Sequence, residues 1–312
     1  MFDHLISRFF KRLKFSNLIR YIKDIKDFGD KLSIVSVSTY RFAEKFAREH
    51  YENFPVISFL VKKELRKHVA VIYWFARTAD DIADETNLPD EDKIINLNHF
   101  EGRLTSLLKG NFENDYEAAL YNSITVNNLT HSLFYDLLTA FKQDLVKKRY
   151  QSFDELLNYC KYSANPVGRL ILELYGLRDN NIVLNYSDKI CTALQLINFY
   201  QDVQIDYKMN RIYFPLDEMS KFAVTENMFE LNKINHNLEK LVKYNVDRTD
   251  KILEEGQKLL EFLPGRLKTE IKWTILGGKE VLNKIKKNSF NIFNRPKLNK
   301  FDFLTLFLKS FV

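Results

Sequence analysis

The chain has 312 residues, enough to bury a substantial core in one large domain or two modest ones. It contains only 9 glycines and 6 prolines, which leaves few tight turns and favours long helices. The net charge of +6 suits nucleic acid, an anionic membrane surface or a phosphorylated substrate. Because the basic residues gather at the two ends while the central motifs are acidic, we expect no nucleic-acid partner.

Two further features concern the compartment. The cysteines, Cys160 and Cys191, form neither a CxxC pair nor a zinc pattern, which fits a reducing compartment. No stretch approaches the roughly 18 consecutive apolar residues that span a bilayer, and the N-terminus lacks the pattern of a secretory signal. We therefore expect a cytoplasmic protein, with peripheral contact at the inner face of the cytoplasmic membrane as a further expectation.

Aromatic residues make up 14% of the chain, including 26 Phe and 16 Tyr. Two interpretations stay open at this point. One is an aromatic-rich core, and the other is a large apolar cavity that holds a greasy ligand.

The first segment, residues 1–32, places apolar residues at helical spacing with Lys and Arg between them. This pattern predicts a basic amphipathic helix that packs on the domain, anchors at a membrane surface or forms a mobile arm. We assign 1–39 to this N-terminal extension, 40–290 to the catalytic domain and 291–312 to an apolar and basic tail. The tail either dips into a membrane interface or packs against the domain.

The rest of the chain shows helical periodicity almost throughout, with no internal repeat and almost no alternation of period two. The sequence therefore predicts a single-domain, all-α helical bundle. The predicted helices cover residues 40–50, 61–84, 90–109, 117–126, 130–147, 153–162, 166–175, 186–207, 237–262 and 266–287.

Near the end of the second predicted helix stands the acidic cluster ADDIADE. Asp80 and Asp84 are four residues apart, so their side chains lie on one helix face a turn apart. Asp81 and Glu85 form a second such pair on a neighbouring face. Like charges at this spacing repel, and a cation between them relieves the repulsion. The preceding turns are apolar, which indicates that the cluster opens from the core into a cavity.

The same geometry recurs in NFYQDVQID. Asp202 and Asp206 are four residues apart and Asn198 lies four before Asp202, which predicts three oxygen ligands along one face of one helix. Two acidic faces more than a hundred residues apart, each within apolar sequence, are hard to explain as solvated surface. Their joint use as hard oxygen ligands is the economical interpretation.

Carboxylates with no clustered histidine or cysteine suit Mg²⁺, with Mn²⁺ as a substitute, and Mg²⁺ commonly bridges carboxylates to phosphate oxygens. Two facing sites therefore predict a diphosphate substrate. Arg77, one turn before the first pair, and Arg211, after the second motif, are candidates to stabilise the departing diphosphate. A carbocation left behind needs shielding from water and aromatic π faces. Several aromatic residues near the motifs are candidates, each of them equally a core residue, and Tyr73 and Tyr159 are put forward on the resemblance described next.

These motifs resemble those of the squalene and phytoene synthase family, over about residues 40–287. ARTADDIADE is similar to the family's first aspartate motif, NFYQDVQID with NRIYFP to its second, and YCKYSANPVG to its YCxxVAGxVG segment. The resemblance implies an isoprenoid synthase-type bundle around a large apolar cavity. It also implies that Asp80, Asp84, Asn198, Asp202 and Asp206 hold Mg²⁺ and that Tyr159 lines the cavity near the leaving group.

Three departures from the family pattern resemble its hydroxysqualene synthase branch. Asn165 replaces the usual glycine, Gln201 replaces the usual arginine before the second aspartate pair, and HYENFPVIS, which begins at His50, replaces a segment rich in Ser and Phe. Enzymes of that branch ionise presqualene diphosphate and trap the cation with water. We expect Asn165 and Gln201 to hold that water and His50 to bind the diphosphate, although Asn165 is equally suited to cap the helix begun by Pro166.

Two alternatives remain open. The nearer one is condensation of two farnesyl diphosphates to presqualene diphosphate, squalene or dehydrosqualene by the same fold. The other is an inactive scaffold or assembly factor, against which the intact aspartate pairs argue. No NADPH is expected for the favoured reaction, and the oligomeric state is left open.

Overall fold

The computed structural model describes residues 37–49 and 60–311, which form helices and connecting loops without a strand. The predicted all-α class is therefore confirmed. Within these ranges, no helix is long and apolar enough to cross a membrane. The basic extension at 1–36 and the segment with His50 lie outside the described residues.

Two compact units make up the chain. Of the described residues, the N-terminal unit comprises 37–49, 60–145 and 173–175, and the C-terminal unit comprises 146–172 and 176–311. The three-part division predicted from composition stays a prediction, as does the large apolar cavity.

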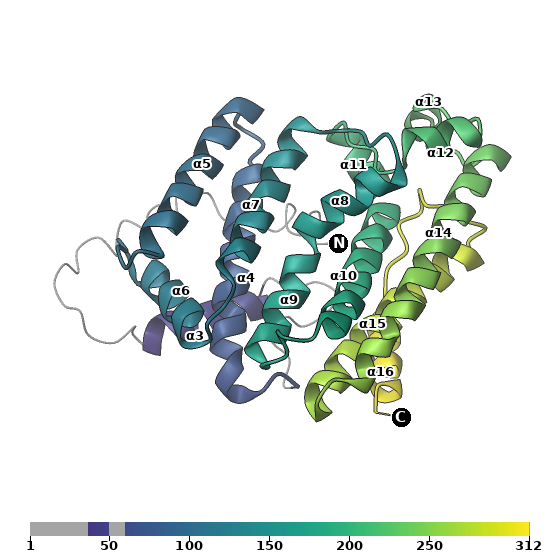
Figure 1. Ribbon diagram of the computed structural model, residues 1–312. Coiled ribbons are helices and arrows are strands. Elements are labelled where there is room, and N and C mark those ends of the chain that lie inside the picture. The colour runs from purple at the N-terminus through teal and green to yellow at the C-terminus, as the bar shows by residue number, and fades with distance from the viewer. Residues whose placement is uncertain (1–36, 50–59, 312) are drawn as a thin grey trace. The chain divides into compact units, whose positions relative to one another are not determined.

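The N-terminal unit is organised around helix α4 (Figure 1). α4 packs on α3, α5 and α6, and almost every position along its central turns is buried. Trp74 on α4 meets the ring of Phe42 on α3, with centroids 5.2 Å apart. The helices of this unit are α3 (Val37–Glu49), α4 (Lys63–Ala83), α5 (Asp90–Leu107), α6 (Asp115–Val126) and α7 (His131–Val146).

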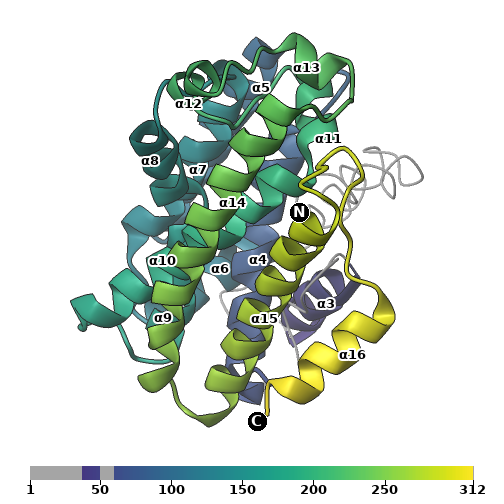
Figure 2. The same ribbon diagram turned by 90° about the vertical axis from the view of Figure 1, so that its right-hand side faces the viewer.

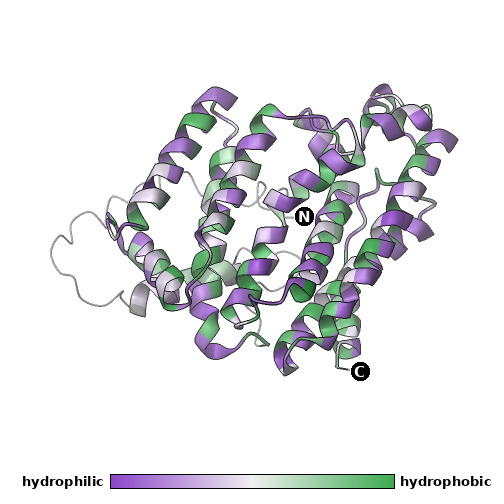
Figure 3. Ribbon diagram, in the orientation of Figure 1, coloured by the Kyte–Doolittle hydropathy of each residue, from purple (hydrophilic) through white to green (hydrophobic). Residues whose placement is uncertain are grey.

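In the C-terminal unit, α10 packs along α14 and also contacts α8 and α15, and α10, α14 and α15 lie side by side in Figures 1 and 2. Apolar and polar residues mix along α14 and α15 in Figure 3, as expected for helices with one buried face. The helices here are α8 (Phe153–Ser163), α9 (Asn165–Leu174), α10 (Asn181–Gln201), α11 (Val203–Lys208), α12 (Leu216–Lys221), α13 (Asn227–Glu230), α14 (His236–Gly256), the 3₁₀ helix η2 (Gln257–Glu261), α15 (Gly265–Lys287) and α16 (Lys300–Lys309).

Gly168 marks a close approach between α9 and α10. A Cβ atom at this position would lie 2.5 Å from both Cys191 Sγ and Ser187 Oγ, closer than real contacts allow. Any larger residue at position 168 would therefore force the Ser187 and Cys191 side chains to shift.

The boundaries of the predicted helices are close to the observed ones, with two exceptions that matter for the site. The helix predicted over 186–207 begins at Asn181 and ends at Gln201, and the short α11 follows it. The tail, for which no helix was predicted, contains α16. Its start is fixed by a capping box in which the side chains of Asn299 and Asp302 each accept a hydrogen bond from the other residue's backbone N–H.

Candidate active site

The first aspartate motif ends α4 in the N-terminal unit, and its central contact is an arginine clamp. Arg77 Nη1 donates to Asp80 Oδ2 at 2.9 Å, and Arg77 Nη2 donates to Asp81 Oδ1. Arg77, Asp80 and the nearby Tyr73 are buried, and Asp84 follows as the C-cap residue, with its backbone N–H bonded to the Asp80 carbonyl. The predicted spacing of this motif is therefore present.

Arg77 stays charged in this setting. Burial alone would lower the pKa of Arg77, but the negative charges of Asp80 and Asp81 outweigh it and raise the pKa above its ordinary value. Arg77 is thus a charged residue one turn before Asp80, and its role toward a leaving diphosphate stays a prediction. In this structure its guanidinium neutralises two carboxylates of its own helix.

The second motif lies at the end of α10 in the C-terminal unit. Asn198, Asp202 and Asp206 are all buried. The prediction of one continuous helix through them is wrong, because α10 ends at Gln201 and Asp202 stands between α10 and α11. The i to i+4 backbone bonds from Asp202 N to Asn198 O, at 3.0 Å, and from Asp206 N to Asp202 O, at 2.9 Å, nevertheless persist across the interruption. The spacing of about one turn between successive ligands therefore survives.

The donor set of this motif fits a hard cation. Asn198 Oδ1 is buried and accepts no hydrogen bond from any residue that the structure describes. A buried amide oxygen without a donor is costly unless something else satisfies it. Together with the buried carboxylates of Asp202 and Asp206, it forms an all-oxygen set of the kind that Mg²⁺ prefers.

Neither motif completes a metal site alone. Among residues 37–49 and 60–311, no three His, Cys, Asp or Glu side chains gather closely enough to hold an ion. The predicted metal site therefore stays a prediction. Mg²⁺ typically completes its shell with waters and substrate phosphate oxygens.

A second arginine, which the sequence analysis did not select, pairs with Asp202. Arg295 Nε lies 2.5 Å from Asp202 Oδ1, and Arg295 Nη2 donates to Asp202 Oδ2 at 3.2 Å. Pro296, the residue after Arg295, is also bound to this motif, because Gln201 Nε2 donates a hydrogen bond to the Pro296 carbonyl at 2.6 Å. The segment between α15 and α16 is thereby fastened to the end of α10 at two adjacent positions.

Arg211 follows a turn that Arg149 braces. Asn210 has a left-handed backbone with φ of 59°, and Arg149 donates to its carbonyl and to its Oδ1. Arg149 also binds Glu226 with two hydrogen bonds of 2.7 Å each. Because the Arg211 backbone N–H in turn bonds to the Asp206 carbonyl at 2.8 Å, the turn fixes where Arg211 leaves the second motif.

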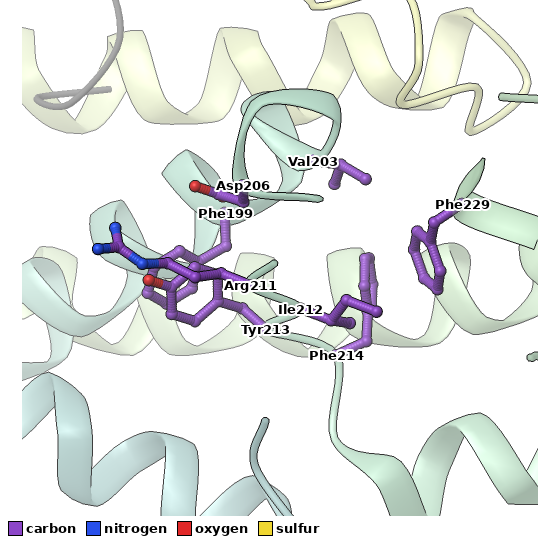
Figure 4. A pocket seen from close by; sticks show the side chains of 8 residues that line it. All are labelled: Phe199, Val203, Asp206, Arg211, Ile212, Tyr213, Phe214 and Phe229. Carbon is purple, nitrogen blue, oxygen red and sulfur yellow. The ribbon is translucent and has the colours of Figure 1, made fainter. Parts of the chain in front are cut away.

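Beside Asp206 and Arg211 lies a small pocket lined largely by aromatic and aliphatic side chains (Figure 4). The figure shows the Asp206 carboxylate and the Arg211 guanidinium on the side away from Phe229. The floor is aromatic, with the Tyr213 ring stacked on Phe199 at a centroid distance of 3.7 Å. The lining residues are Phe199, Val203, Asp206, Arg211, Ile212, Tyr213, Phe214 and Phe229.

Tyr159 belongs to the same aromatic cluster. Its ring centroid lies 6.0 Å from those of both Phe199 and Tyr213. The cluster therefore lies next to the second aspartate motif, and the role of Tyr159 toward a cation stays a prediction. Phe199 and Tyr213 were not selected as site residues, although Tyr213 stands within the quoted NRIYFP segment.

The two residues expected to hold a water have other partners here. Asn165 Oδ1 accepts a hydrogen bond from Thr192 Oγ1 at 3.0 Å, which links the start of α9 to α10. Gln201 uses its Nε2 on Pro296, while its Oε1 is buried without a hydrogen bond from the described residues. Their roles toward water stay predictions, with the free Oε1 of Gln201 as the atom best placed for one.

The predicted residues thus fall into two groups. Tyr73, Arg77, Asp80 and Asp84 lie on α4 in the N-terminal unit. The C-terminal unit holds Tyr159, Asn165, Asn198, Gln201, Asp202, Asp206 and Arg211. The sequence did not identify Arg295 as a site residue, because its partner Asp202 is 93 residues away. The one signal was that Arg295 lies in the basic segment near the C-terminal end.

Comparisons with known proteins identify the family of the chain. A family model described as squalene/phytoene synthase matches residues 47–302. Hydroxysqualene synthase of Zymomonas mobilis is 40% identical over 178 residues, covering 56% of this chain and 58% of that protein. Hydroxysqualene synthase of Rhodopseudomonas palustris is 35% identical over 210 residues, covering 67% of this chain and 70% of that protein.

A solved structure, squalene synthase HpnC from Alicyclobacillus acidocaldarius, superposes with a TM-score of 0.76 at 32% identity and covers 81% of this chain and 95% of its own. The family match spans most of the chain and includes both aspartate motifs, the aromatic cluster and Arg295. The chain belongs to the squalene/phytoene synthase family.

Proposed function

We propose that the chain is an enzyme that ionises presqualene diphosphate and adds water, which yields hydroxysqualene and diphosphate in hopanoid or squalene biosynthesis. The observation that carries this proposal is the identity of 40% and 35% to two hydroxysqualene synthases, taken together with two intact aspartate motifs. The chain spans 58% of the length of the Zymomonas protein that it matches.

The reaction begins when the carbon–oxygen bond to diphosphate breaks and the bonding electrons leave with the diphosphate. The cyclopropylcarbinyl cation then rearranges with opening of the ring. A water oxygen attacks the resulting cation and loses a proton to solvent or to the diphosphate. Only one water must reach the cation, so the site has to exclude all others.

The residues of the C-terminal unit suit these demands. Tyr159, Phe199 and Tyr213 offer aromatic faces to a cation beside Asp206. Arg211 and Arg295 are cations at the same motif and are suited to hold phosphate oxygens. Arg77 is suited to do the same at the first motif.

We propose Mg²⁺ as the cofactor, with Mn²⁺ as a substitute. The residues that would hold it are Asp80, Asp84, Asn198, Asp202 and Asp206. Bound there, the metal would supply charge neutralisation for the departing diphosphate. The support comes from the unpartnered Asn198 oxygen and from the all-oxygen character of both motifs.

Product analysis tests the proposal. The purified chain is incubated with Mg²⁺ and either presqualene diphosphate or farnesyl diphosphate, without NADPH. Release of hydroxysqualene from presqualene diphosphate is expected. Turnover of farnesyl diphosphate together with inertness toward presqualene diphosphate would instead assign condensation, a reaction for which the likeness to a squalene synthase structure speaks.

We further propose that the reaction takes place at the inner face of the cytoplasmic membrane, because an apolar product of this size partitions into lipid.

A further inference from the structure

We propose that the exposed face of α16 docks on an anionic membrane surface. The proposal stands on the geometry and charge of this helix and is independent of which prenyl diphosphate the site takes. α16 lies beside α15 in the C-terminal unit (Figure 2).

One side of α16 is packed. The Trp273 ring of α15 meets Phe307 edge-on at 5.0 Å and Phe303 at 6.5 Å, and Leu306 is buried. The helix is therefore held against α15 by its own apolar residues, and this contact leaves the other side outward.

The outward side is also apolar. Phe301, Leu304 and Leu308 are spaced by three and four positions and fall on one face of α16, and Phe311, whose ring meets Phe307 edge-on at 4.9 Å, follows just after the helix ends. We name these four residues the α16 apolar face. Their exposed fractions are 81% for Phe301, 56% for Leu304, 60% for Leu308 and 58% for Phe311. A helix with apolar residues on both sides has a second surface to bury.

This face differs from the other exposed apolar residues of the described chain. Ile95, Val126, Val146 and Ile182 are exposed to a comparable degree, but each lies on a different helix or at its end. Single exposed apolar residues are normal, whereas a contiguous patch marks an interaction site.

Charge identifies the occupant. Residues 290–312 contain four basic residues and one acidic residue, Asp302, which is paired with Lys284 at 2.8 Å. Lys297, Lys300 and Lys309 are exposed around the apolar face. Aromatic and leucine side chains bordered by lysines fit the boundary between anionic headgroups and acyl chains. A second copy docking through the same face would bring like charges together, which disfavours self-association.

The helix is also formed before it docks. The capping box of Asn299 and Asp302, the Lys284 ion pair and the Trp273 contacts hold α16 in place. Docking therefore does not pay the entropy of helix formation, unlike an unstructured tail.

Vesicle flotation of the full chain tests the proposal, with vesicles of phosphatidylcholine and phosphatidylglycerol in equal parts or of phosphatidylcholine alone. Binding to the anionic vesicles is expected for the unaltered chain. The triple variant Phe301→Ser, Leu304→Ser, Leu308→Ser should lower the partition coefficient at least about tenfold. A triple variant with Val126→Ser, Val146→Ser and Ile182→Ser is the matched control and should bind like the unaltered chain.

Charge is tested separately with Lys297→Gln, Lys300→Gln and Lys309→Gln, which should remove most of the preference for anionic vesicles. Circular dichroism checks that each variant is folded, and sedimentation velocity reports its oligomeric state. Unaltered binding of the α16 triple variant would overturn the proposal and assign any membrane contact to another segment. So would an unaltered chain that binds no vesicles but dissociates into smaller species when the α16 face is changed, since the occupant is then a second copy.

Discussion

The two aspartate motifs resemble each other in sequence but are built differently. On α4 the balancing cation is Arg77, three and four residues before the carboxylates that it binds. At the end of α10 the balancing cation is Arg295, brought from 93 residues away by the segment before α16. A local arginine is fixed by the helix that also carries the carboxylates, whereas a distant one depends on the tertiary fold.

The two motifs also differ in their backbone. α4 runs without interruption to Ala83 with Asp84 as its cap, while the second motif is divided between α10 and α11 at Asp202. The one-turn spacing between the carboxylates persists in both motifs, although one continuous helix carries the first pair and the second pair lies where α10 and α11 meet. Function at the second motif should therefore depend more strongly on contacts outside the motif.

The largest expected effect comes from the carboxylates themselves. Asp80→Asn and Asp202→Asn should each lower kcat by about 10³-fold, because either removes a charge that holds the metal and diphosphate in the proposed mechanism. Asp81→Asn is the control, since Asp81 shares Arg77 but lies on the neighbouring helix face. Steady-state kinetics with presqualene diphosphate measures all three, and equal losses for Asp80 and Asp81 would contradict the assigned face.

The N-terminal unit should be more sensitive to acid. Burial, with a smaller contribution from Lys67, lowers the pKa of His68 on α4 to about 4, and Ser123 Oγ lies 3.0 Å from His68 Nδ1. Above pH 6.5, the ordinary value, folded and unfolded chains both keep His68 neutral. As the pH falls from there toward 4, only the unfolded chain takes up the proton, so stability drops by up to about 3 kcal/mol.

Denaturant unfolding at a series of pH values measures this slope. His68→Gln should flatten it, because glutamine keeps a hydrogen-bonding group toward Ser123 without titrating. His99→Gln, at an exposed position of α5, is the control and should leave the slope of stability against pH as in the unaltered chain. An undiminished slope in His68→Gln would show that another group causes the acid sensitivity.

Replacing Arg295 tests whether the second aspartate motif depends on a cation from a distant segment. Arg295→Gln leaves the buried Asp202 carboxylate without its cation and should cost about 2 kcal/mol of folding stability without metal. This is below the value for fully buried pairs because the Arg295 side chain is 17% exposed. Mg²⁺ should restore part of the loss.

The matched control is Arg169→Gln, which breaks the bidentate pair with Asp188 in the same unit. The Arg169 side chain is 40% exposed, so the cost should be within about 1 kcal/mol. Thermal unfolding with a chelator or with Mg²⁺ compares the two. An equal Mg²⁺ response in both variants would show that Asp202 is not the metal ligand.

The smallest effect is expected at Arg149, a positioning residue that braces the turn before Arg211. Arg149→Lys keeps the charge but loses the paired bonds to Glu226, so Arg211 should be held less firmly. We expect KM to rise by up to about tenfold with a smaller change in kcat. Glu226→Gln should reproduce part of this effect, and a loss confined to kcat would contradict a positioning role.

The sequence was sufficient for what depends on nearby residues. Helical periodicity and the four-residue spacing predicted α4, the acidic faces and the all-α class. The Arg295–Asp202 pair, the Gln201–Pro296 bond and the stacking of Tyr213 on Phe199 depend on how distant segments fold together, which no local pattern contains. Helix α16, in contrast, could have been predicted from nearby residues, because the spacing of Asn299 and Asp302 is that of a capping box.

The proposed mechanism requires that both aspartate motifs bind the same metal–diphosphate group. Crystals of the chain grown with Mn²⁺ and inorganic diphosphate allow the metal to be located by its anomalous scattering. We predict Mn²⁺ bridging the diphosphate to carboxylate oxygens of α4 and to those at the end of α10. Metal bound at one motif alone, or at neither, with diphosphate held elsewhere, would contradict the account.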